Sequence, residues 1–545
     1  MAGHDFSLQV AFDTTRDALV AFISRTRQMD VSTIIFGPVV ATALFVPLLY
    51  VAFYIVVSIY RIYFHPLSRF PGPKKAAISN AWLLEMSNAG ELEVVLERLH
   101  DEYGISNLTL RDFRKLREIT RLGVKAVRIG PNELHLTDTS LYKTIYSQTK
   151  PWPKDADFYS GFGTPHTLFV EHDVALHKER RRLLNSFFSK STIQSLEPMI
   201  VDKVKILMAR IDRLDSSKPV NIGNAARCLN ADFISEYAFA KSLDTLKVSN
   251  DCFEADFLTA FDASGRSLWT MIYSPVLRRV AQAMPRGITK RLSPEITKLL
   301  EFFDWSKLCV QAYRSREKAD NGKPVMFDAL TSLDVVNTAA EGVDILAAGT
   351  DTTAFSLCVG LYYILRDQAI YRKLMDALLA AIPDQRQMPT LPNLEKIEYL
   401  SACVKESVRV ASAVPGRLPR VVPQDVQNLA VDGKRVPPGT TVGISAYTMH
   451  NSTELWGHDA RSFHPERWLG EGGKKLDQYM VAFSKGARSC IGQNLAFAEL
   501  TLALPYLLRN YEINLLPDST IAANDYFTKA ARHPGVLVYM SRRSF

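Results

Sequence analysis

The chain has 545 residues, of which 47% are hydrophobic, and it carries a formal net charge of +8 at pH 7. This length allows two or three ordinary domains, or one large catalytic domain with an extensive core. The positive charge is small for the size, and no dense run of Lys and Arg interleaved with aromatic residues occurs, which argues against a nucleic-acid-binding protein. We expect the basic surface to meet an acidic protein partner.

The six cysteines are widely spaced along the chain and include no C-x-x-C pair. This spacing predicts neither a zinc site nor a disulfide framework. A reducing environment that faces the cytosol fits this pattern best.

Residues 31–60 contain no charged side chain and are mainly apolar. About 20 apolar residues are enough to cross the hydrocarbon layer, so this stretch predicts one retained transmembrane anchor in spite of Pro38 and Pro47. A cleaved signal peptide is the alternative, but the run is too long, lies too deep in the chain and lacks a small-residue cleavage site. Positive charges are slightly more numerous after the anchor, which predicts a luminal segment at residues 1–30 and a main domain in the cytosol.

Residues 61–75 contain three closely spaced prolines and predict a stiff hinge after the anchor. No second linker or repeat follows, so residues 76–545 are predicted to form one domain. Residues 127–136 have the pattern of a strand, a turn and a strand, whereas long helical patterns dominate after residue 170. The predicted fold class is therefore mainly α with a minor β-sheet region.

A loop rich in proline, glycine and aromatic residues is predicted at residues 150–173, and a basic helix begins near His177. For Arg180 and Arg182 on this helix, the alternative is a solvated basic face. Such a face is also suited to docking a protein partner.

Residues 334–367 have the pattern of one long helix, with the sequence Ala-Gly-Thr-Asp-Thr-Thr at its centre. Ala348 and Gly349 lie four and three positions before Thr352, which places them on one face. Small residues there leave room for a ligand that the Thr352 hydroxyl can hydrogen-bond, and Asp351 lies about a quarter-turn away, where it can exchange protons with water. The alternative is a core helix whose threonine hydroxyls bond back to carbonyls one turn earlier.

Glu406 and Arg409 are three positions apart on an apolar helix and share a face, and Arg467 follows in a Pro-Glu-Arg-Trp sequence. A lone pair of this kind is also common on surfaces, where it contributes little to stability. Between these segments, residues 415–423 have the pattern of an extended strand that carries Arg420.

A single cysteine, Cys490, lies in a turn-forming frame with Phe483, Gly486, Arg488 and Gly492 around it. Glycines allow positive φ angles and a close approach of backbone N–H groups to sulfur, which suits a thiolate presented to a metal. A buried inert cysteine is the alternative. The five matched positions favour the metal ligand, and an apolar helix is predicted to follow.

The cysteine frame matches the haem-binding signature of the cytochrome P450 family, F-x-x-G-x-R-x-C-x-G, at every defined position, and A-G-x-D-T-T, E-x-x-R and P-E-R-W occur in the family's order. The chain thus resembles a membrane-bound P450, which implies the cytochrome P450 fold for the haem-thiolate domain. It also implies haem b with Cys490 as the axial iron ligand, because Cys thiolate holds the haem of this family.

The resemblance implies further roles for particular residues. Asp351 and Thr352 would be catalytic and would deliver protons to bound dioxygen. Glu406, Arg409 and Arg467 would form a structural network that braces the Cys490 loop. The family often has W-x-x-x-R in the basic helix, but His177 stands at the Trp position here, so Arg181 is the safer assignment. The cofactor-binding residues implied are Arg181, Gly349, Arg420, Phe483, Gly486, Arg488 and Cys490.

The resemblance implies a monooxygenase that inserts one atom of O2 into a hydrophobic small molecule by hydroxylation or epoxidation. Its electrons would come from a separate NADPH-cytochrome reductase, because no flavin or nucleotide domain fits in the chain. The chain looks similar to fungal members such as trichodiene-oxygenase-like enzymes, which implies a terpenoid or polyketide-derived intermediate of secondary metabolism. Single-pass anchoring in the endoplasmic reticulum membrane would favour such apolar substrates.

Two alternatives stay open at this point. One is a haem-thiolate isomerase or dehydratase that needs no external electrons, against which the intact Ala-Gly-Thr-Asp-Thr-Thr sequence argues. The other is a non-catalytic haem-binding protein, which predicts no reductase-dependent turnover.

Overall fold

The computed structural model describes residues 31–106, 123–164, 166–248, 252–315 and 325–543. The chain divides into two compact units, Met1–Ser68 and Arg69–Phe545. The predicted luminal segment, residues 1–30, lies outside the described residues.

The N-terminal unit is organised around helix α2 (Val31–Ile59), which coincides with the predicted anchor. A π-helical turn, η1 (Tyr60–Phe64), continues it, so the helix is longer than the sequence predicts. It ends at His65, whose backbone is extended, as expected for a residue that precedes a proline. Phe45–Phe64 has a mean hydropathy of 1.9 and no buried residue, so it is long and apolar enough to cross a membrane.

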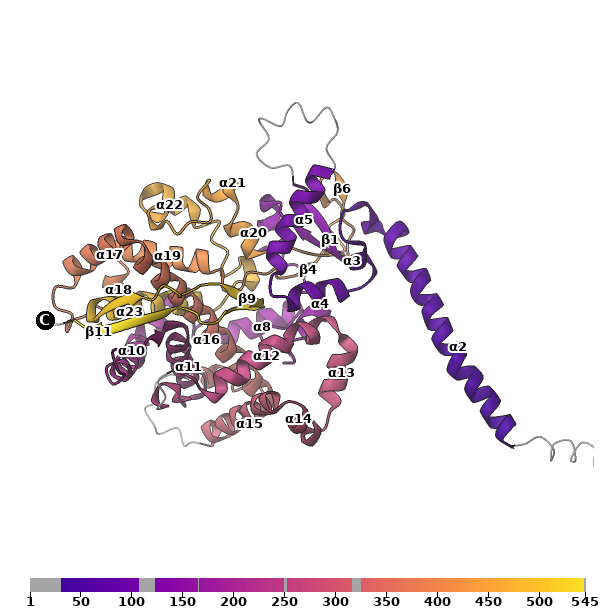
Figure 1. Ribbon diagram of the computed structural model, residues 1–545, viewed down its shortest axis with the longest axis horizontal. Helices are drawn as coiled ribbons and strands as arrows, with labels where there is room; N and C mark the ends of the chain where they lie inside the picture. The colour runs from indigo at the N-terminus through magenta and orange to yellow at the C-terminus, as the bar shows by residue number, and fades with distance from the viewer. Residues whose placement is uncertain (1–30, 107–122, 165, 249–251, 316–324, 544–545) are drawn as a thin grey trace, which may run out of the picture. The chain divides into compact units, whose positions relative to one another are not determined.

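The second unit is mainly helical, as predicted (Figure 1). Its α-helices are α3 (Lys74–Ile78), α4 (Ala81–Asn88), α5 (Leu92–Ser106), α6 (Tyr142–Ile145), α7 (Ala156–Ser160), α8 (Val174–Leu184), α9 (Lys190–Ser195), α10 (Glu197–Ile211), α11 (Ile222–Phe239), α12 (Asp256–Tyr273), α13 (Pro275–Ala283), α14 (Arg286–Leu292), α15 (Pro294–Arg314), α16 (Val335–Arg366), α17 (Gln368–Ala381), α18 (Leu391–Leu394), α19 (Glu398–Ala411), α20 (Ala446–His450), α21 (Thr453–Trp456), α22 (Gly470–Leu476) and α23 (Gln493–Asn510).

Four small sheets account for the strands among the described residues. The strands are β1 (Ala126–Gly130), β2 (Glu133–Leu136), β7 (Thr441–Gly443) and β4 (Arg420–Val421) in one sheet; β3 (Val220–Asn221), β11 (Leu537–Arg542) and β8 (Tyr511–Leu515) in a second; and the pairs β9 (Ala523–Tyr526) with β10 (Thr528–Ala531) and β5 (Ala430–Val431) with β6 (Lys434–Arg435).

The sheet pairings confirm the predicted strand, turn and strand at residues 127–136, because β1 pairs antiparallel with β2. The extended strand predicted at residues 415–423 is wrong in length, since only Arg420–Val421 enters the sheet. Prolines at 415, 419 and 423 lack the N–H that a ladder requires, which limits this segment to a short edge strand.

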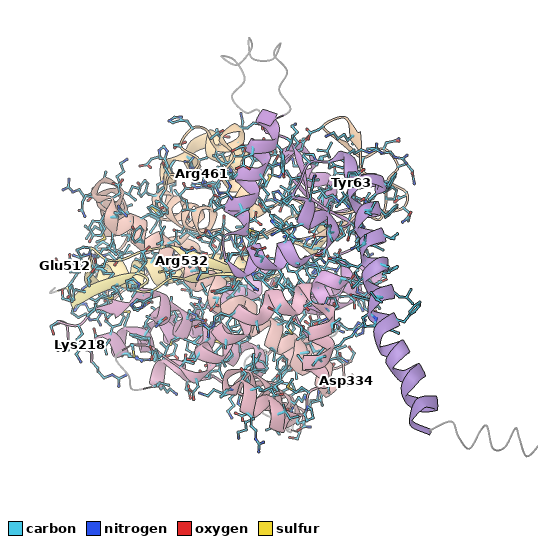
Figure 2. The ribbon with its side chains drawn as sticks, turned by 45° about the vertical axis from the view of Figure 1, so that its right-hand side comes forward. Tyr63, Lys218, Asp334, Arg461, Glu512 and Arg532 are labelled. Carbon is cyan, nitrogen blue, oxygen red and sulfur yellow. The ribbon has the colours of Figure 1, made fainter. Side chains whose placement is uncertain are left out.

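Helix α16 forms the centre of the second unit, and its bounds confirm the predicted long helix. Asp334, exposed at the periphery in Figure 2, begins the helix by accepting a hydrogen bond from the backbone N–H of Asn337 (2.8 Å). From there α16 passes through the interior and packs against α11, α15, α19 and α23. A Cβ at Gly360 would lie 2.3 Å from Oγ of Ser407, so glycine lets α19 approach this closely.

Candidate active site

The loop that carries Cys490 is shaped by a glycine that no other residue can replace without strain. Gly486 has a φ of +75°, and a Cβ there would lie 2.2 Å from the carbonyl oxygen of Tyr146. The next residue, Ala487, donates its N–H to the carbonyl of Ser147 (3.2 Å), and Cys490 N–H bonds to the carbonyl of Phe483 (2.8 Å). The loop is thus closed on itself and fastened to the segment that follows α6.

We expect Gly486→Ala to destabilise the protein by about 1–3 kcal/mol, because alanine must adopt a left-handed conformation and displace a backbone carbonyl. The midpoint of urea unfolding in detergent measures this loss. Gly472→Ala is the matched control, since a Cβ at Gly472 meets no atom within 4 Å. Equal midpoints for the two variants would contradict the role given to Gly486.

Cys490 presents its thiol to a cavity of about 1400 Å³ inside the second unit. The side chain is exposed toward this cavity. Burial within the protein raises the pKa of the Cys490 thiol, while the backbone N–H of Gly492 and the guanidinium of Arg181 act in the opposite direction. The N–H of Gly492 and the guanidinium of Arg181 thus stabilise the thiolate, which is the form that binds metals.

The cavity collects most of the residues that the sequence singles out. Gly486, Glu406, Arg409 and Arg467 are not among its lining residues. Those that line it are Arg181, Gly349, Asp351, Thr352, Arg420, Phe483, Arg488 and Cys490.

Basic side chains lie close together on one wall of this cavity. Arg181, Arg420 and Arg488 are joined there by Lys154 and His177. Burial, reinforced by Arg488 and Lys154, lowers the pKa of His177 to about 2, so this histidine is neutral. Burial and the neighbouring Arg420 likewise lower the pKa of Arg488 to about 10. A wall with these cations is suited to an anionic group.

Arg488 has an unsatisfied donor that supports this conclusion. Its terminal nitrogens donate to the carbonyls of Glu171, His172 (3.0 Å) and Asp173 (2.9 Å). Its Nε is buried and has no hydrogen-bond partner among the described residues. Arg181 donates to the carbonyl of Ser489 (2.6 Å), next to the cysteine. These donors therefore fit a bound group with negatively charged oxygens, such as the propionates of haem.

Two other arginines, Arg180 and Arg417, are held by ion pairs with glutamates. Arg180 forms a buried ion pair with Glu341 (2.8 Å), so its interpretation as part of a solvated face is wrong. The ion pair with Glu341 on α16 leaves only 15% of the Arg180 side chain exposed. Arg417 donates to a carboxylate oxygen of Glu133 (2.6 Å) and to the hydroxyl of Tyr273 (3.0 Å), and it does not line the cavity.

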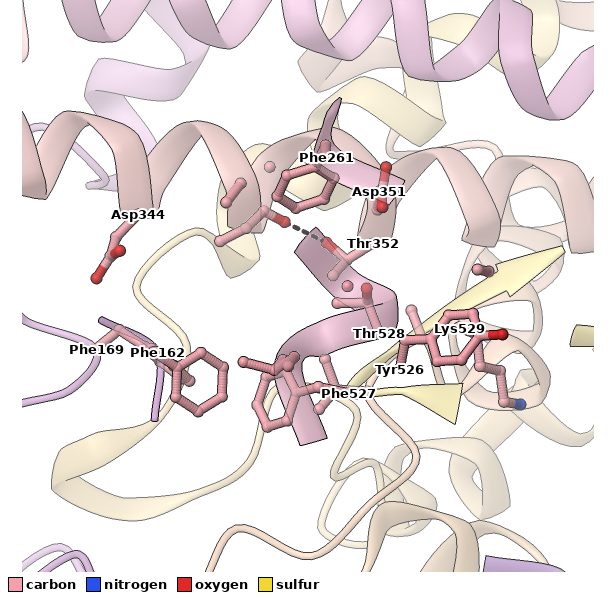
Figure 3. Close-up of a pocket in the computed structure, with 18 of the residues that line it drawn as sticks. Phe162, Phe169, Phe261, Asp344, Asp351, Thr352, Tyr526, Phe527, Thr528 and Lys529 are labelled. Carbon is pink, nitrogen blue, oxygen red and sulfur yellow. Dashed lines mark hydrogen bonds between the residues drawn. The ribbon is translucent and has the colours of Figure 1, made fainter. Parts of the chain in front are cut away.

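Thr352 and Asp351 occupy the middle of α16, at the edge of the cavity (Figure 3). The Thr352 hydroxyl donates to the carbonyl of Ala348 (2.8 Å), which is the backbone bond of the core-helix alternative. Its oxygen keeps lone pairs that can accept a further hydrogen bond from the cavity.

Asp351 is held by an ion pair. It accepts a hydrogen bond from Nε of Arg227 (2.7 Å), and Arg227 also donates to Asp262 (2.6 Å), which is more exposed. Burial raises the pKa of Asp351, and Arg227 opposes that rise. Asp351 is thus linked to the more exposed Asp262 through Arg227, in a chain of ion pairs that joins α16, α11 and α12.

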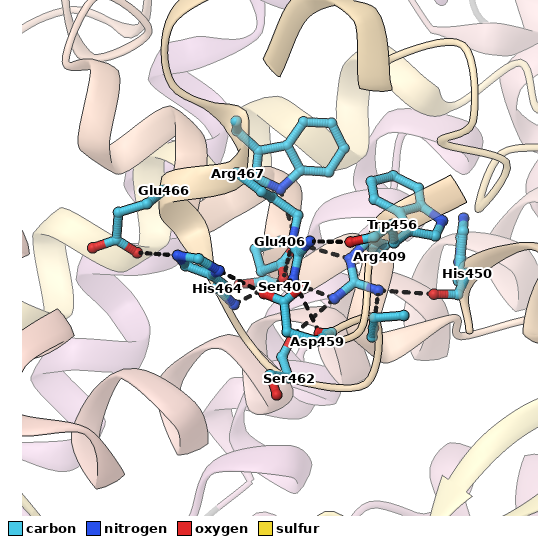
Figure 4. A network of polar contacts seen from close by, with 12 residues as sticks. Glu406, Ser407, Arg409, His450, Trp456, Asp459, Ser462, His464, Glu466 and Arg467 are labelled. Atoms are coloured by element: carbon cyan, nitrogen blue, oxygen red, sulfur yellow. Dashed lines mark hydrogen bonds and ion pairs between the residues drawn. The ribbon is translucent and has the colours of Figure 1, made fainter. Parts of the chain in front are cut away.

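The three residues of the predicted structural network lie together, away from the cavity lining (Figure 4). Arg409 forms a two-point ion pair with Glu406, with distances of 2.8 and 2.7 Å. Nε of Arg467 donates to the same carboxylate (3.0 Å). The indole N–H of Trp468 (2.9 Å) and the backbone N–H of His464 (2.8 Å) complete its coordination, so the buried charge of Glu406 is fully satisfied.

The sequence analysis missed His450, which connects this network to the cysteine loop. Arg409 donates to the carbonyl of His450 (2.9 Å), and Nε2 of His450 accepts the N–H of Val481 (3.0 Å). The carbonyl of Val481 in turn accepts the N–H of Ser484 (2.8 Å), inside the loop. No spacing rule identifies this histidine, because its partners lie 41 and 31 positions away.

Comparisons with known proteins agree with this geometry. The family profile described as Cytochrome P450 matches residues 127–537. The cytochrome P450 monooxygenase sdnE of Sordaria araneosa is 32% identical over 494 residues, covering 86% of this chain and 91% of the relative. The monooxygenase sol6 of Alternaria solani is 30% identical, with coverages of 82% and 94%, and conidiogenone synthase PchP450 of Penicillium rubens is 30% identical, with coverages of 84% and 89%.

The crystal structure of the cytochrome P450DA heme domain has a TM-score of 0.66 to this structure at 17% sequence identity, covering 79% of this chain and 91% of that chain. This likeness shows the fold. The chain belongs to the cytochrome P450 family. The predicted family, fold and monooxygenase class are thereby confirmed, and family membership implies haem iron, a redox partner, O2 and a hydrophobic substrate.

Proposed function

We propose that the protein is a haem-thiolate monooxygenase in which Cys490 is the axial ligand of the haem iron. The observation that carries the proposal is the placement of the Cys490 thiol in one cavity with Thr352 and a cation-rich wall. A thiolate ligand donates electron density that favours cleavage of the O–O bond.

The residues around the cavity fit haem b. Arg181, Arg420 and Arg488 would hold the propionates, and the unpartnered Nε of Arg488 supplies a free donor for them. Phe483 would pack on the macrocycle near the cysteine, and Gly349 leaves space against α16. Haem, when bound, supplies O2 activation with two electrons, so that one oxygen atom enters a C–H or C=C bond.

Asp351 and Thr352 are proposed to bring protons to the cavity. Asp351 is held by Arg227, which also pairs with the more exposed Asp262. Because an ion pair holds Asp351 in place, its release from Arg227 would precede proton transfer toward Thr352. General acid catalysis of this kind typically contributes about 10²–10⁴-fold to a rate.

We expect Asp351→Asn to slow product formation by about 10²-fold and to increase the kinetic solvent isotope effect, because the amide transfers no proton. Product formation and NADPH consumption are measured together, in H2O and D2O. Asp376→Asn, an exposed change on α17, is the control. An unchanged rate and isotope effect in Asp351→Asn would exclude Asp351 from proton delivery.

The relatives support a place in fungal secondary metabolism. One of them is named conidiogenone synthase, and others are named monooxygenases of fungi. We propose a terpenoid or polyketide-derived substrate, hydroxylated or epoxidised with electrons from NADPH-cytochrome reductase. We propose that residues 31–60 anchor the protein in the endoplasmic reticulum membrane, with residues 61–75 as hinge and residues 76–545 as a cytosolic domain. The apolar helix Phe45–Phe64 supports the anchor.

The decisive experiment is turnover under 18O2 with NADPH and the reductase, beside the reduced CO-bound absorption spectrum. We expect a strongly red-shifted Soret band and one 18O atom per product molecule. A haem-loaded protein without that band would overturn thiolate ligation. Conversion of substrate without reductase or O2 would instead support an isomerase or dehydratase.

A further inference from the structure

One cavity-lining carboxylate, Asp344 of α16, has no part in the proposed chemistry. It accepts hydrogen bonds from the hydroxyls of Thr164 (3.1 and 3.2 Å) and Thr167. Burial raises the pKa of Asp344 to about 6, which leaves it mostly ionised at neutral pH. It is half-buried, and its accessible side faces the cavity.

The acceptor capacity of Asp344 is only partly used. An ionised carboxylate offers about four lone-pair sites, and two threonine hydroxyls hold two protons between them. Among the described residues, no cation forms an ion pair with Asp344; Lys154, the nearby positive charge, donates to the carbonyl of Phe169. A partly buried carboxylate in this state gains stability when another donor completes its hydrogen bonding.

Glu341 lies one turn before Asp344 on the same helix, and its partners differ from those of Asp344. It also lines the cavity, but it is paired with Arg180 (2.8 Å) and accepts the backbone N–H of Leu168 (2.7 Å). Its charge is compensated within the protein. Asp344 is not compensated in this way and remains open to a ligand.

The surroundings define what kind of ligand fits. In Figure 3 the carboxylate of Asp344 points toward the side of the cavity that contains Phe162 and Phe169. The ring of Phe162 lies 4.9 Å from that of Phe169 and 4.8 Å from that of Phe527, between centroids. These rings form an apolar wall near Asp344, and Nζ of Lys154 lies 4.8 Å from the centroid of Phe169.

Thr352 lies eight residues after Asp344 on α16, which corresponds to about 12 Å along the helix axis. Ala348, midway between them, also lines the cavity and adds no bulk. A ligand with one end at Asp344 can therefore lie along α16 and reach the proposed oxygen site with its other end.

We infer that Asp344, with Thr164 and Thr167, binds a hydrogen-bond-donating group of the substrate and sets which carbon lies next to Thr352. The inference rests on the proposed function and deepens it. The substrate is an apolar skeleton that already carries a hydroxyl or protonated amino group about 12 Å from the carbon to be oxidised. An enzyme that installs such a donor group must precede this one. Carboxylate substrates are disfavoured, because like charges repel at this site.

The test uses the haem-loaded full chain in detergent and three probes, 1-dodecanol, 1-methoxydodecane and dodecanoate. The ether differs from the alcohol by lacking the donor. Dissociation constants are measured by calorimetry, with the Soret shift as a second readout. We expect the alcohol to bind about tenfold more tightly than the ether, as for a hydrogen bond to a charged group. In Asp344→Asn the two constants become equal within about twofold.

Glu341→Gln is the matched control and keeps the alcohol preference. The inference is overturned if wild type binds alcohol and ether equally, if Asp344→Asn keeps the preference, or if dodecanoate binds as tightly as the alcohol. The comparison of alcohol and ether binding to the wild type tests the inference even if a variant does not fold. A normal red-shifted CO spectrum beside equal binding constants would overturn this inference alone, whereas loss of that band would overturn the proposed function.

Discussion

Replacement of Cys490 by serine is expected to remove the red-shifted Soret band of the reduced CO-bound protein and to abolish oxygenation. Serine is a harder, far less acidic ligand than cysteine, so it supplies no thiolate to the iron. Changes in groups that merely orient a metal ligand cost about 10–100-fold in activity or affinity, so loss of the ligand itself is expected to exceed about 100-fold. The absorption spectrum and 18O incorporation measure the two effects separately.

Cys358 supplies the matched control for this experiment. It also lines the cavity, yet its thiol is buried in α16, where burial raises its pKa to about 12. Cys358→Ala is expected to keep the spectrum of the wild type. A spectrum that survives in Cys490→Ser and disappears in Cys358→Ala would transfer the ligand role to Cys358.

The parts of the site that the sequence predicts are those built from residues close together in the chain. The frame from Phe483 to Cys490 and the segment from Ala348 to Thr352 each lie within ten positions, so their spacing alone indicates a shared loop or helix face. The structure places both in one cavity. Their predicted chemical roles remain predictions.

Residues that act across long separations were not predictable. Arg227 lies 124 positions before Asp351 and was visible only as a charged residue in an otherwise largely uncharged helix. His450 connects Arg409 to Val481 through its carbonyl and a ring nitrogen. No sequence pattern indicates either hydrogen bond. In both cases packing of distant helices decides the contact, and residue pattern carries no information about it.

The short strand around Arg420 shows a different limit. Apolar and basic residues there have an extended pattern, but hydrogen bonding depends on N–H groups that the prolines lack. The pattern therefore predicts a longer strand than the structure contains. Arg420 still reaches the cavity, because its donation to the hydroxyl of Tyr159 (3.1 Å) fixes the side chain.

Arg409→Met is expected to cost about 3–5 kcal/mol of unfolding free energy, because it leaves the carboxylate of Glu406 buried with half of its ion pairing removed. Glu406 and Arg409 are 0% and 1% exposed, so water cannot replace the lost partner. The carbonyls of His450, Ala460 and Ser462 lose their donor as well. Because His450 holds Val481, the loss extends to the Cys490 loop, and we expect haem to dissociate more readily.

Urea unfolding in detergent measures the loss of unfolding free energy. The rate of haem transfer to an acceptor protein measures how readily haem dissociates. Arg386→Met is the control, since its ion pair with Asp384 lies on the surface with Arg386 77% exposed, where such pairs contribute below about 1 kcal/mol. In the double variant Glu406→Gln/Arg409→Met we expect a cost smaller than the sum of the single changes, because no unpaired charge remains. A loss below about 1 kcal/mol in Arg409→Met would show that the network does not brace the loop.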